Sequence, residues 1–273
     1  MNLQAAGPAW LFCPADRPER FAKAAAAADV VILDLEDGVA EADKHAARKA
    51  LQETPLDPER TVVRINAADT ADYPRDLDAL AGTAYTTVML SKTESAAQVT
   101  ALAPREVIAL LETPRGAVFA TEIAAADNTV ALMWGAEDLV ATLGGSSSRK
   151  ADGSYRDVAQ HVRSTALLTA NAFGRVALDA VHLDIPDLDG LRAEAEDAVA
   201  LGFAGTVCIH PSQVAVVRKA FRPTEEELDW ARRVLAAARH ERGVFAFEGQ
   251  MVDSPVLKHA ATLVRRSGES VSD

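Results

Sequence analysis

The sequence predicts an α/β protein, a (β/α)8 TIM barrel with a C-terminal helical lid or arm. Short apolar runs alternate with alanine-rich segments almost from end to end, which is the pattern of a parallel sheet beneath its crossover helices. Eight such runs occur, the number that closes a barrel. An open doubly wound sheet could hold the same elements, but no GxGxxG follows the first run, so its dinucleotide-binding form loses its main support.

The expected strands and helices follow from hydrophobic periodicity. The strands lie at residues 9–13, 30–35, 61–65, 87–90, 107–111, 130–134, 180–183 and 206–209. Helical candidates such as ERFAKAAAAA, EADKHAARKAL and LRAEAEDAVALG separate them. After the sixth strand comes the polar stretch LGGSSSRKADGSYRD, which is either a mobile edge of the site or a passive surface insertion.

The chain is expected to divide into a catalytic barrel over residues 1–222 and a C-terminal helical extension and lid over residues 223–273. Length alone allows one barrel or two smaller domains. The extension contains a strong helix, TEEELDWARRVLAAARHERG, followed by AFEGQMVDSPVLKHAATLVRR. It exceeds what the barrel needs and is too short for a core of its own, so we interpret it as an arm that caps the site or reaches a neighbouring subunit.

Composition and charge exclude several classes of protein. A formal net charge of -12 disfavours nucleic-acid binding. The N-terminus lacks a basic region followed by an apolar run, and no stretch of about 18 apolar residues occurs, so neither export nor a membrane span is predicted. Cys13 and Cys208 stand outside any CxxC or Cys/His cluster, which favours a reducing cytoplasm. Arg17, Arg20 and Lys23 either hold one anionic ligand or form solvated helix surface.

Unusual polar residues collect at the ends of the expected strands, where a barrel carries its functional groups. In chain order they are Asp34, Glu36, Asp37, Arg64, Asn66, Lys92, Glu112, Glu137, Asp138 and His210. A single acidic residue at such a position is often a helix cap or an ion-pair partner. Several carboxylates at one end of a barrel repel one another, and a divalent cation is the simplest remedy.

The expected cation is Mg2+, with Mn2+ as a substitute. Mg2+ prefers oxygen ligands and keeps several waters, so two carboxylates and substrate oxygens complete its shell, and we assign Glu112 and Asp138 as ligands. Zinc is disfavoured because the sequence has no HxxxH or HExxH pair. The cation would stabilise an enolate as a Lewis acid. Arg64 either assists at the same oxyanion, binds a substrate carboxylate or is a structural ion-pair partner, and His210 is either functional or structural.

Seven short segments carry a resemblance to a known family. They are FCPADRPERF, LDLEDGV, VVRIN, ALLET, WGAEDL, CIHPSQ and GQMVDSP, which span residues 11–255. In this order they resemble the motifs of the citrate lyase beta-subunit family, within the superfamily that also holds malyl-CoA and citramalyl-CoA lyases and metal-dependent pyruvate aldolases. The chain departs from the pattern at Ser91, where relatives often have proline, and at Pro114, where many have alanine, but neither change removes a proposed ligand.

The resemblance implies a Mg2+-dependent carbon–carbon lyase that cleaves a 3-hydroxyacyl-CoA thioester to an acyl-CoA and an oxo acid through a metal-stabilised enolate. It implies Glu112 and Asp138 as metal ligands, with Glu112 also contacting the substrate. Arg64 is then a catalytic residue that contacts the substrate and the oxyanion. Glu36 and Asp37 would orient metal-bound water, and Asp37 is counted with the catalytic residues.

The resemblance also implies partners. Arg17 and Lys23, in and just after PADRPERF, would contact the phosphates of coenzyme A or of a phosphopantetheine arm. In the related malyl-type lyases, an aspartate on the late lid is a general acid/base supplied by an adjacent subunit, and Asp253 stands at that place. A homo-oligomer, most simply a trimer, would explain the extension. An acyl carrier protein is the less favoured alternative to free CoA thioesters.

Other functions share the same site. If water attacked the thioester carbonyl, the protein would be a malyl-CoA-type thioesterase. A citryl-carrier-protein lyase subunit would be active only with its carrier partners, and a pyruvate aldolase would cleave 4-hydroxy-2-oxo acids without any need for Arg17 and Lys23. The acyl group stays open among malyl, citramalyl, citryl and 3-hydroxy-3-methylglutaryl, because one methyl group changes binding by only about 1 to 3 kcal/mol.

Overall fold

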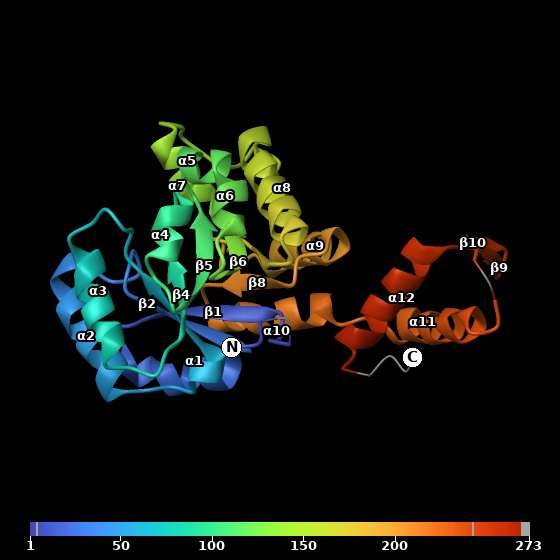
Figure 1. Ribbon diagram of the computed structural model, residues 1–273, viewed down its shortest axis with the longest axis horizontal. Helices are drawn as coiled ribbons and strands as arrows, with labels where there is room; N and C mark the ends of the chain where they lie inside the picture. The colour runs from blue at the N-terminus through green and yellow to red at the C-terminus, as the bar shows by residue number, and fades with distance from the viewer. Residues whose placement is uncertain (4, 242, 269–273) are drawn as a thin grey trace. The chain divides into compact units, whose positions relative to one another are not determined.

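The computed structural model describes residues 1–3, 5–241 and 243–268. The chain forms two compact units, Met1–Arg218 and Lys219–Asp273. The first unit contains a closed sheet, and the second contains a two-stranded sheet with helices. In Figure 1 the first unit runs from blue to orange and the second is drawn in orange-red to red.

Eight parallel strands close the barrel in chain order, and β1 pairs with β8. They are β1 (Ala9–Pro14), β2 (Val30–Asp34), β3 (Thr61–Ile65), β4 (Thr87–Leu90), β5 (Glu106–Leu111), β6 (Thr129–Trp134), β7 (Val176–Asp179) and β8 (Gly205–Cys208). Strands such as β2 are buried along their whole length, because helices cover the outer face and side chains fill the interior. The predicted (β/α)8 barrel is confirmed.

The interior of the barrel is a packed apolar core. Ile32, Met89 and Ile108, from three different strands, have no exposed surface there. The same cluster includes Trp10, Val62, Leu110, Met133, Leu178 and Val207. Because the interior is filled, ligands are expected at the open carboxyl ends of the strands and in the loops that follow them.

Helices follow the strands around the barrel (Figure 1). They are α1 (Phe21–Ala27), α2 (Lys44–Glu53), α3 (Asp72–Ala81), α4 (Ala96–Thr100), α5 (Pro114–Val118), α6 (Ala120–Ala125), α7 (Ala136–Thr142), α8 (Asp157–Ala172), α9 (Leu188–Leu201) and α10 (Pro211–Phe221). Local signals set several ends: Ser95 and Gln98 form a capping box at α4, and Asp187 caps α9. Gly202 ends α9 with a φ of 102°, in the left-handed region that favours glycine.

The seventh strand begins and ends earlier than predicted. The sequence predicts a strand at 180–183, but β7 is Val176–Asp179. The segment VALDAVHL contains two apolar runs, one before and one after Asp179. The first of these runs forms the strand, because Asp179 is held at its end. Its carboxylate accepts hydrogen bonds from Trp134 Nε1 at 2.6 Å and from Arg163 Nη2 at 2.7 Å, which fixes this residue at the end of the strand.

The second unit packs two helices and a hairpin together. It consists of α11 (Glu225–Ala238), β9 (Phe245–Phe247), β10 (Gln250–Val252) and α12 (Ser254–Arg266). Thr224 and Glu227 form a capping box at the start of α11. The sequence predicts a tail too short for a core, and the structure corrects this, because the apolar faces of the elements bury a small cluster: Ala231, Val234, Val252, Ala260, Leu263 and Val264.

Within the ranges that the structure describes, no helix has both the length and the apolar character needed to cross a membrane.

Candidate active site

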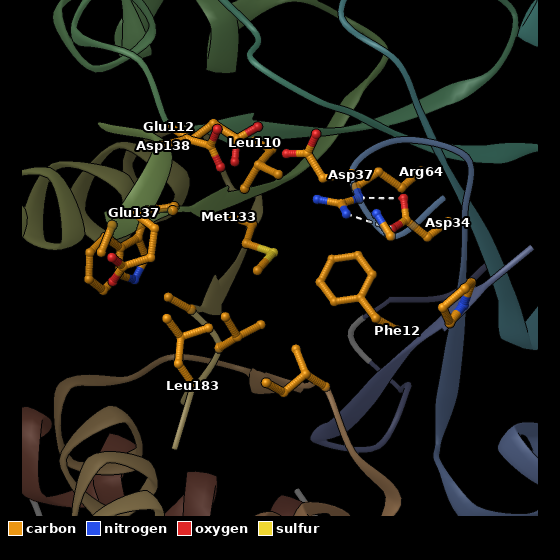
Figure 2. A pocket seen from close by; sticks show the side chains of 18 of the residues that line it. Phe12, Asp34, Asp37, Arg64, Leu110, Glu112, Met133, Glu137, Asp138 and Leu183 are labelled. Carbon is orange, nitrogen blue, oxygen red and sulfur yellow. Dashed lines mark hydrogen bonds and ion pairs between the residues drawn. The ribbon is translucent and has the colours of Figure 1, made fainter. Parts of the chain in front are cut away.

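A cavity of about 340 Å3 opens at the carboxyl ends of the barrel strands. Its charged lining residues are Asp34, Asp37, Arg64, Glu112, Glu137 and Asp138, and its apolar lining includes Phe12, Leu110, Met133, Val181, Leu183 and Ile209. Figure 2 shows Glu112 and Asp138 on one side of the cavity and Leu183 on the opposite side. A pair of carboxylates and an apolar side chain therefore face one another across the cavity.

Arg64, at the end of β3, is held in a fixed orientation. Its Nε and Nη2 atoms donate to Asp34 Oδ1 and Oδ2 at 2.7 and 2.6 Å, and Nη1 lies 3.1 Å from Glu36 Oε2. The guanidinium stacks over the Phe12 ring, 4.5 Å from its centroid. Burial lowers the pKa of Arg64, but the Asp34 and Glu36 carboxylates outweigh it and keep the pKa above its ordinary value. A permanent, well-oriented positive charge therefore lines the cavity.

Asp34 also organises the loop that follows β2. Its Oδ1 accepts from the backbone N–H of Glu36, and its Oδ2 accepts from that of Gly38, both at 2.9 Å. A side chain on Gly38 would place Cβ 2.2 Å from Asp34 Oδ2, so only glycine fits here. Glu36 Oε2 in turn accepts from the backbone N–H of Asp37 at 2.9 Å. The acidic motif LDLEDG is thus one hydrogen-bonded turn, in which Asp34 is committed to structure.

Lys44, on α2, supports this loop from behind. Its Nζ donates to the carbonyl oxygens of Leu35 at 2.8 Å and Glu36 at 3.1 Å, and to Asn66 Oδ1 at 2.8 Å. Three acceptors satisfy all three N–H groups of the buried ammonium. The sequence analysis missed Lys44, because a lysine inside a helical segment is ordinarily solvated and no local signal marks this one as buried.

Glu112, immediately after β5, is a buried carboxyl with 3% exposure. Its Oε1 accepts from the backbone N–H of Lys92 at 2.9 Å. A Cβ on Gly135 would lie 2.9 Å from Glu112 Oε2, so the glycine at the end of β6 leaves room for this side chain. Burial raises the pKa of Glu112 to about 8, and the Asp138 carboxylate adds to the rise, while Lys92 and Arg64 act against it.

The charges around Glu112 fit a divalent cation. Asp138, in the first turn of α7, lines the same cavity and raises the pKa of Glu112, so negative charge at this point is incompletely compensated. Lys92 Nζ lies 3.2 Å from Asp138 Oδ1 and forms an ion pair with Glu36. No group of three metal-binding side chains gathers within residues 1–3, 5–241 and 243–268. A cation bound by Glu112 and Asp138 would therefore complete its shell with water and substrate.

The predicted phosphate contacts lie outside the lining of this cavity. Arg17 is exposed and its Nε is 3.4 Å from Asp16 Oδ2, while Lys23 is exposed on α1. His210 is also exposed, and its Nδ1 is 2.8 Å from Ser212 Oγ, next to the start of α10.

Asp253 belongs to the second unit. It is the N-cap of α12, where its Oδ1 accepts from the backbone N–H of Val256 at 3.3 Å. Its side chain also lines a cavity within that unit, together with Val244, Leu257 and Lys258.

Two aromatic residues of the cavity wall were missed by the sequence analysis. The rings of Trp134 and Tyr155 meet edge to face with centroids 5.0 Å apart, and both line the cavity. Tyr155 comes from the polar stretch after β6, so part of that stretch borders the site. A second cavity of about 750 Å3 adjoins the first, and the two share Glu137, Tyr155, Ala180 and Leu183. The signal was available, because Tyr155 is the one aromatic residue in LGGSSSRKADGSYRD.

Comparison with known proteins identifies relatives along the whole chain. A citrate lyase subunit beta-like protein of Mycobacterium tuberculosis is 78% identical over 273 residues, which is 100% of both chains. The mitochondrial citramalyl-CoA lyase of Rattus norvegicus is 31% identical and covers 86% of this chain and 78% of its own. A (3S)-malyl-CoA thioesterase of Cereibacter sphaeroides is 34% identical and covers 89% of this chain and 88% of its own.

A solved structure gives the same relationship. Protein CitE from Mycobacterium tuberculosis, in complex with magnesium, acetoacetate and coenzyme A, has a TM-score of 0.94 and 78% identity, covering 97% of this chain and 100% of that chain. The model of the HpcH/HpaI aldolase/citrate lyase family matches residues 9–211, from the first residue of β1 to the first of α10. The resemblance found in the sequence is confirmed: the chain belongs to the HpcH/HpaI aldolase/citrate lyase family of enzymes.

Proposed function

We propose that this protein is a Mg2+-dependent carbon–carbon lyase that cleaves a 3-hydroxyacyl-CoA thioester to a shorter acyl-CoA and an oxo acid. The observation that carries the proposal is the buried carboxyl of Glu112 beside Asp138, in a cavity that Arg64 also lines. The citramalyl-CoA lyase relative and the CitE complex with magnesium, acetoacetate and coenzyme A support it. The acyl group remains open among malyl, citramalyl, citryl and 3-hydroxy-3-methylglutaryl.

Glu112 and Asp138 would hold the Mg2+ ion, and Mn2+ would substitute for it. The Asp138 carboxylate contributes to the raised pKa of Glu112, and two carboxyl groups in one concave site suit a hard divalent cation. The bound cation would supply a Lewis acid that polarises a substrate oxygen. Glu36 and Asp37 would orient the water around the cation. Both contact the ammonium of Lys92, which also contacts the proposed ligand Asp138.

Arg64 would stabilise the oxygen on which negative charge develops. Its contacts with Asp34 and Glu36 use three of its five N–H groups, which leaves one on each terminal nitrogen for a ligand. Cleavage of the C2–C3 bond turns C3 into the carbonyl of the oxo acid and moves the electron pair into the enolate of the acyl thioester. A guanidinium already oriented by Asp34 stabilises such an oxyanion without first having to reorganise.

The same cleavage requires two proton movements. The 3-hydroxyl group must lose a proton, and the enolate carbon must gain one to give the acyl-CoA product. Asp253, supplied by an adjacent subunit of a homotrimer, would take up the hydroxyl proton and return a proton to the enolate carbon. Its position as N-cap of α12 fixes the direction of the carboxylate within its own unit.

Arg17 and Lys23 would bind the phosphates of coenzyme A. Both side chains are exposed on a protein with a net charge of -12, so this local pair of cations would attract an anionic ligand that the net charge of the protein repels. An acyl carrier protein would present a phosphate of the same kind through its phosphopantetheine arm.

Product analysis tests the proposal directly. The purified protein would be incubated with a panel of 3-hydroxyacyl-CoA thioesters, with Mg2+ or with EDTA, and the products identified by mass spectrometry. Release of an oxo acid together with a shortened acyl-CoA, only when Mg2+ is present, is the expected result. Turnover that EDTA does not affect would contradict the proposal.

A thioesterase is the second candidate, favoured by the (3S)-malyl-CoA thioesterase relative. In that case water attacks the thioester carbonyl, and the same experiment yields free CoA and an intact hydroxy acid. If free CoA thioesters are not turned over but a loaded acyl carrier protein is, the protein acts as a carrier-dependent lyase subunit.

A further inference from the structure

We propose that Lys92 is a positioning residue whose ammonium holds the carboxylates of the metal site together before the cation binds, and that it competes with the cation for them. Lys92 would thereby set the affinity of the site for Mg2+. This inference rests on the proposed function, because it assumes that Glu112 and Asp138 are the metal ligands.

The side chain of Lys92 connects carboxylates from two separate segments. Its Nζ forms an ion pair with Glu36 and lies 3.4 Å from Asp37 Oδ2, both in the loop after β2. It also lies 3.2 Å from Asp138 Oδ1, in the first turn of α7. Without this ammonium, three carboxylates would face one another across the edge of the cavity, so the lysine supplies the charge that keeps them close.

The backbone of Lys92 acts on the other proposed ligand. Its N–H donates to Glu112 Oε1 at 2.9 Å, and its φ is 50°, in the left-handed region that a lysine rarely adopts. Such a conformation persists only where the surroundings impose it, and it occurs most often at functional sites. One residue thus positions Glu112 through its main chain and Asp138 through its side chain.

Lys92 does not line the cavity, although Glu112, Asp37 and Asp138 do. Its ammonium contacts these carboxylates from outside the cavity lining and is placed to act through them. Burial lowers the pKa of Lys92, but the Glu36 and Glu112 carboxylates outweigh it and hold the pKa above its ordinary value, so the group is charged at neutral pH.

A divalent cation and this ammonium would compete for the negative charge of the same Asp138 carboxylate. When Mg2+ binds Asp138, the ammonium must give up its share of that carboxylate and withdraw toward Glu36 and Asp37, and the two positive charges repel at short range. Removal of the side-chain charge leaves the backbone bond to Glu112 unchanged. The two roles of the residue can therefore be separated by substitution.

The test compares Mg2+ affinity, by isothermal titration calorimetry without substrate, in the wild-type protein and in Lys92→Met, Lys92→Asn and Lys92→Arg. Methionine keeps most of the apolar stem. Asparagine is suited to the left-handed backbone, so it folds even if methionine is poorly tolerated there. Both should bind Mg2+ at least about tenfold more tightly, and Lys92→Arg, which keeps the charge, should stay within about threefold of wild type.

The melting temperature in EDTA gives a second readout that does not depend on turnover. Lys92→Met should lower it, because the carboxylates of the empty site then repel one another, and added Mg2+ should restore it. Lys150→Met is the matched control: Lys150 pairs with Asp157 at 2.9 Å outside this cavity, so its loss should change neither Mg2+ affinity nor the rescue by Mg2+.

Unchanged or weaker Mg2+ binding in both Lys92→Met and Lys92→Asn would overturn the inference while leaving the lyase proposal intact. Absence of Mg2+ binding by the wild-type protein would overturn the metal site of the proposed function and this inference with it. If tighter binding is found but product analysis shows no cleavage, the role of Lys92 stands and the lyase proposal fails.

Discussion

The carboxylate of Asp34 holds the guanidinium of Arg64 by two parallel hydrogen bonds, Nε to Oδ1 at 2.7 Å and Nη2 to Oδ2 at 2.6 Å. Asp34 is itself fixed by the backbone N–H groups of Glu36 and Gly38. The loop that follows β2 therefore sets the orientation of the Arg64 guanidinium. The same loop thereby fixes the direction of the guanidinium N–H groups that do not contact Asp34 or Glu36.

Replacement of Arg64 by lysine should separate charge from orientation. Arg64→Lys keeps a cation beside Asp34 but loses the two-bond geometry, so we expect kcat/KM to fall by about 10²- to 10³-fold with little change in melting temperature. Arg64→Ala, which leaves Asp34 buried without its partner, should in contrast destabilise the fold by about 3–5 kcal/mol. Steady-state kinetics and urea unfolding of both variants measure the two effects. A lysine variant with wild-type kcat/KM would remove Arg64 from the chemistry.

The raised pKa of Glu112 should make the metal-free protein less stable as pH rises. The ordinary pKa of a glutamate, which applies to the unfolded chain, is 4.5, and the pKa of Glu112 in the folded protein is about 8. Because the folded state then binds the proton more tightly than the unfolded state, the free energy of unfolding should decrease between those two pH values, by up to about 1.4 kcal/mol per pH unit. Urea unfolding in EDTA from about pH 5 to about pH 8 measures the slope.

Glu112→Gln is the control for that pH dependence. Glutamine keeps an oxygen that accepts from the Lys92 N–H but does not titrate, so the slope should flatten. Saturating Mg2+ should reverse the trend in the wild-type protein, since the cation binds the ionised carboxylate and its stabilisation grows with pH. An equally steep decrease in Glu112→Gln would assign the slope to other groups.

The fold was predictable because a barrel repeats one strand–helix pattern eight times. An error in the bounds of one strand therefore does not change the number of strands. Strand β7 illustrates this: it lies at Val176–Asp179 rather than at 180–183, yet the order and closure are unaffected. Hydrophobic periodicity did not distinguish two adjacent apolar runs. The hydrogen bond from Trp134 to Asp179, which does distinguish them, joins residues 45 positions apart in the sequence.

The candidate site was predictable where the location of a residue depends on its place along the main chain. Strand ends meet at one rim, so Arg64, Glu112 and Asp138 line one cavity as their places in the sequence suggest. Contacts that depend on the reach of a long side chain were not predictable. The contacts of the Lys44 and Lys92 ammonium groups are of this kind. The spacing of residues in the sequence does not indicate where the end of a four-carbon side chain lies. The chemical roles of the lining residues remain predictions.

Removal of either proposed metal ligand should abolish Mg2+-dependent turnover. Asp138→Ala and Glu112→Ala delete one of two carboxylate ligands, and the resulting loss of Mg2+ affinity should exceed about 100-fold. Asp138 is only half-buried, and Glu112→Ala removes a carboxyl group whose ionised form is disfavoured by burial, so both variants should keep the circular dichroism spectrum of the barrel. Calorimetric titration with Mg2+ measures the affinity. Full activity in either variant would refute the metal assignment.

The proposed phosphate contacts should affect binding and not chemistry. Arg17→Ala and Lys23→Ala should each raise KM for a CoA thioester several-fold, leave kcat unchanged and weaken the salt dependence of kcat/KM, because both side chains are exposed. Glu19→Ala, which removes an exposed negative charge from the same segment, is the matched control and should leave KM the same or lower it. If KM is insensitive to both cations, coenzyme A binds elsewhere.

Mixed oligomers provide the sharpest test of Asp253. If Asp253 is the proton donor and acceptor, Asp253→Ala should lose far more in kcat than in thioester affinity, because the substitution then removes proton transfer without removing a binding contact. If Asp253 acts on the site of an adjacent subunit, co-expression of Asp253→Ala with Glu112→Ala should restore activity, since about a quarter of the sites in random cyclic oligomers then combine an intact Glu112 with an intact Asp253. If Asp253 acts within its own chain, no subunit carries both residues, and the mixture should be as inactive as either variant alone. Kinetics of the co-expressed protein, compared with a simple mixture of the two separately purified variants, therefore decides whether Asp253 acts on the site of a neighbouring subunit.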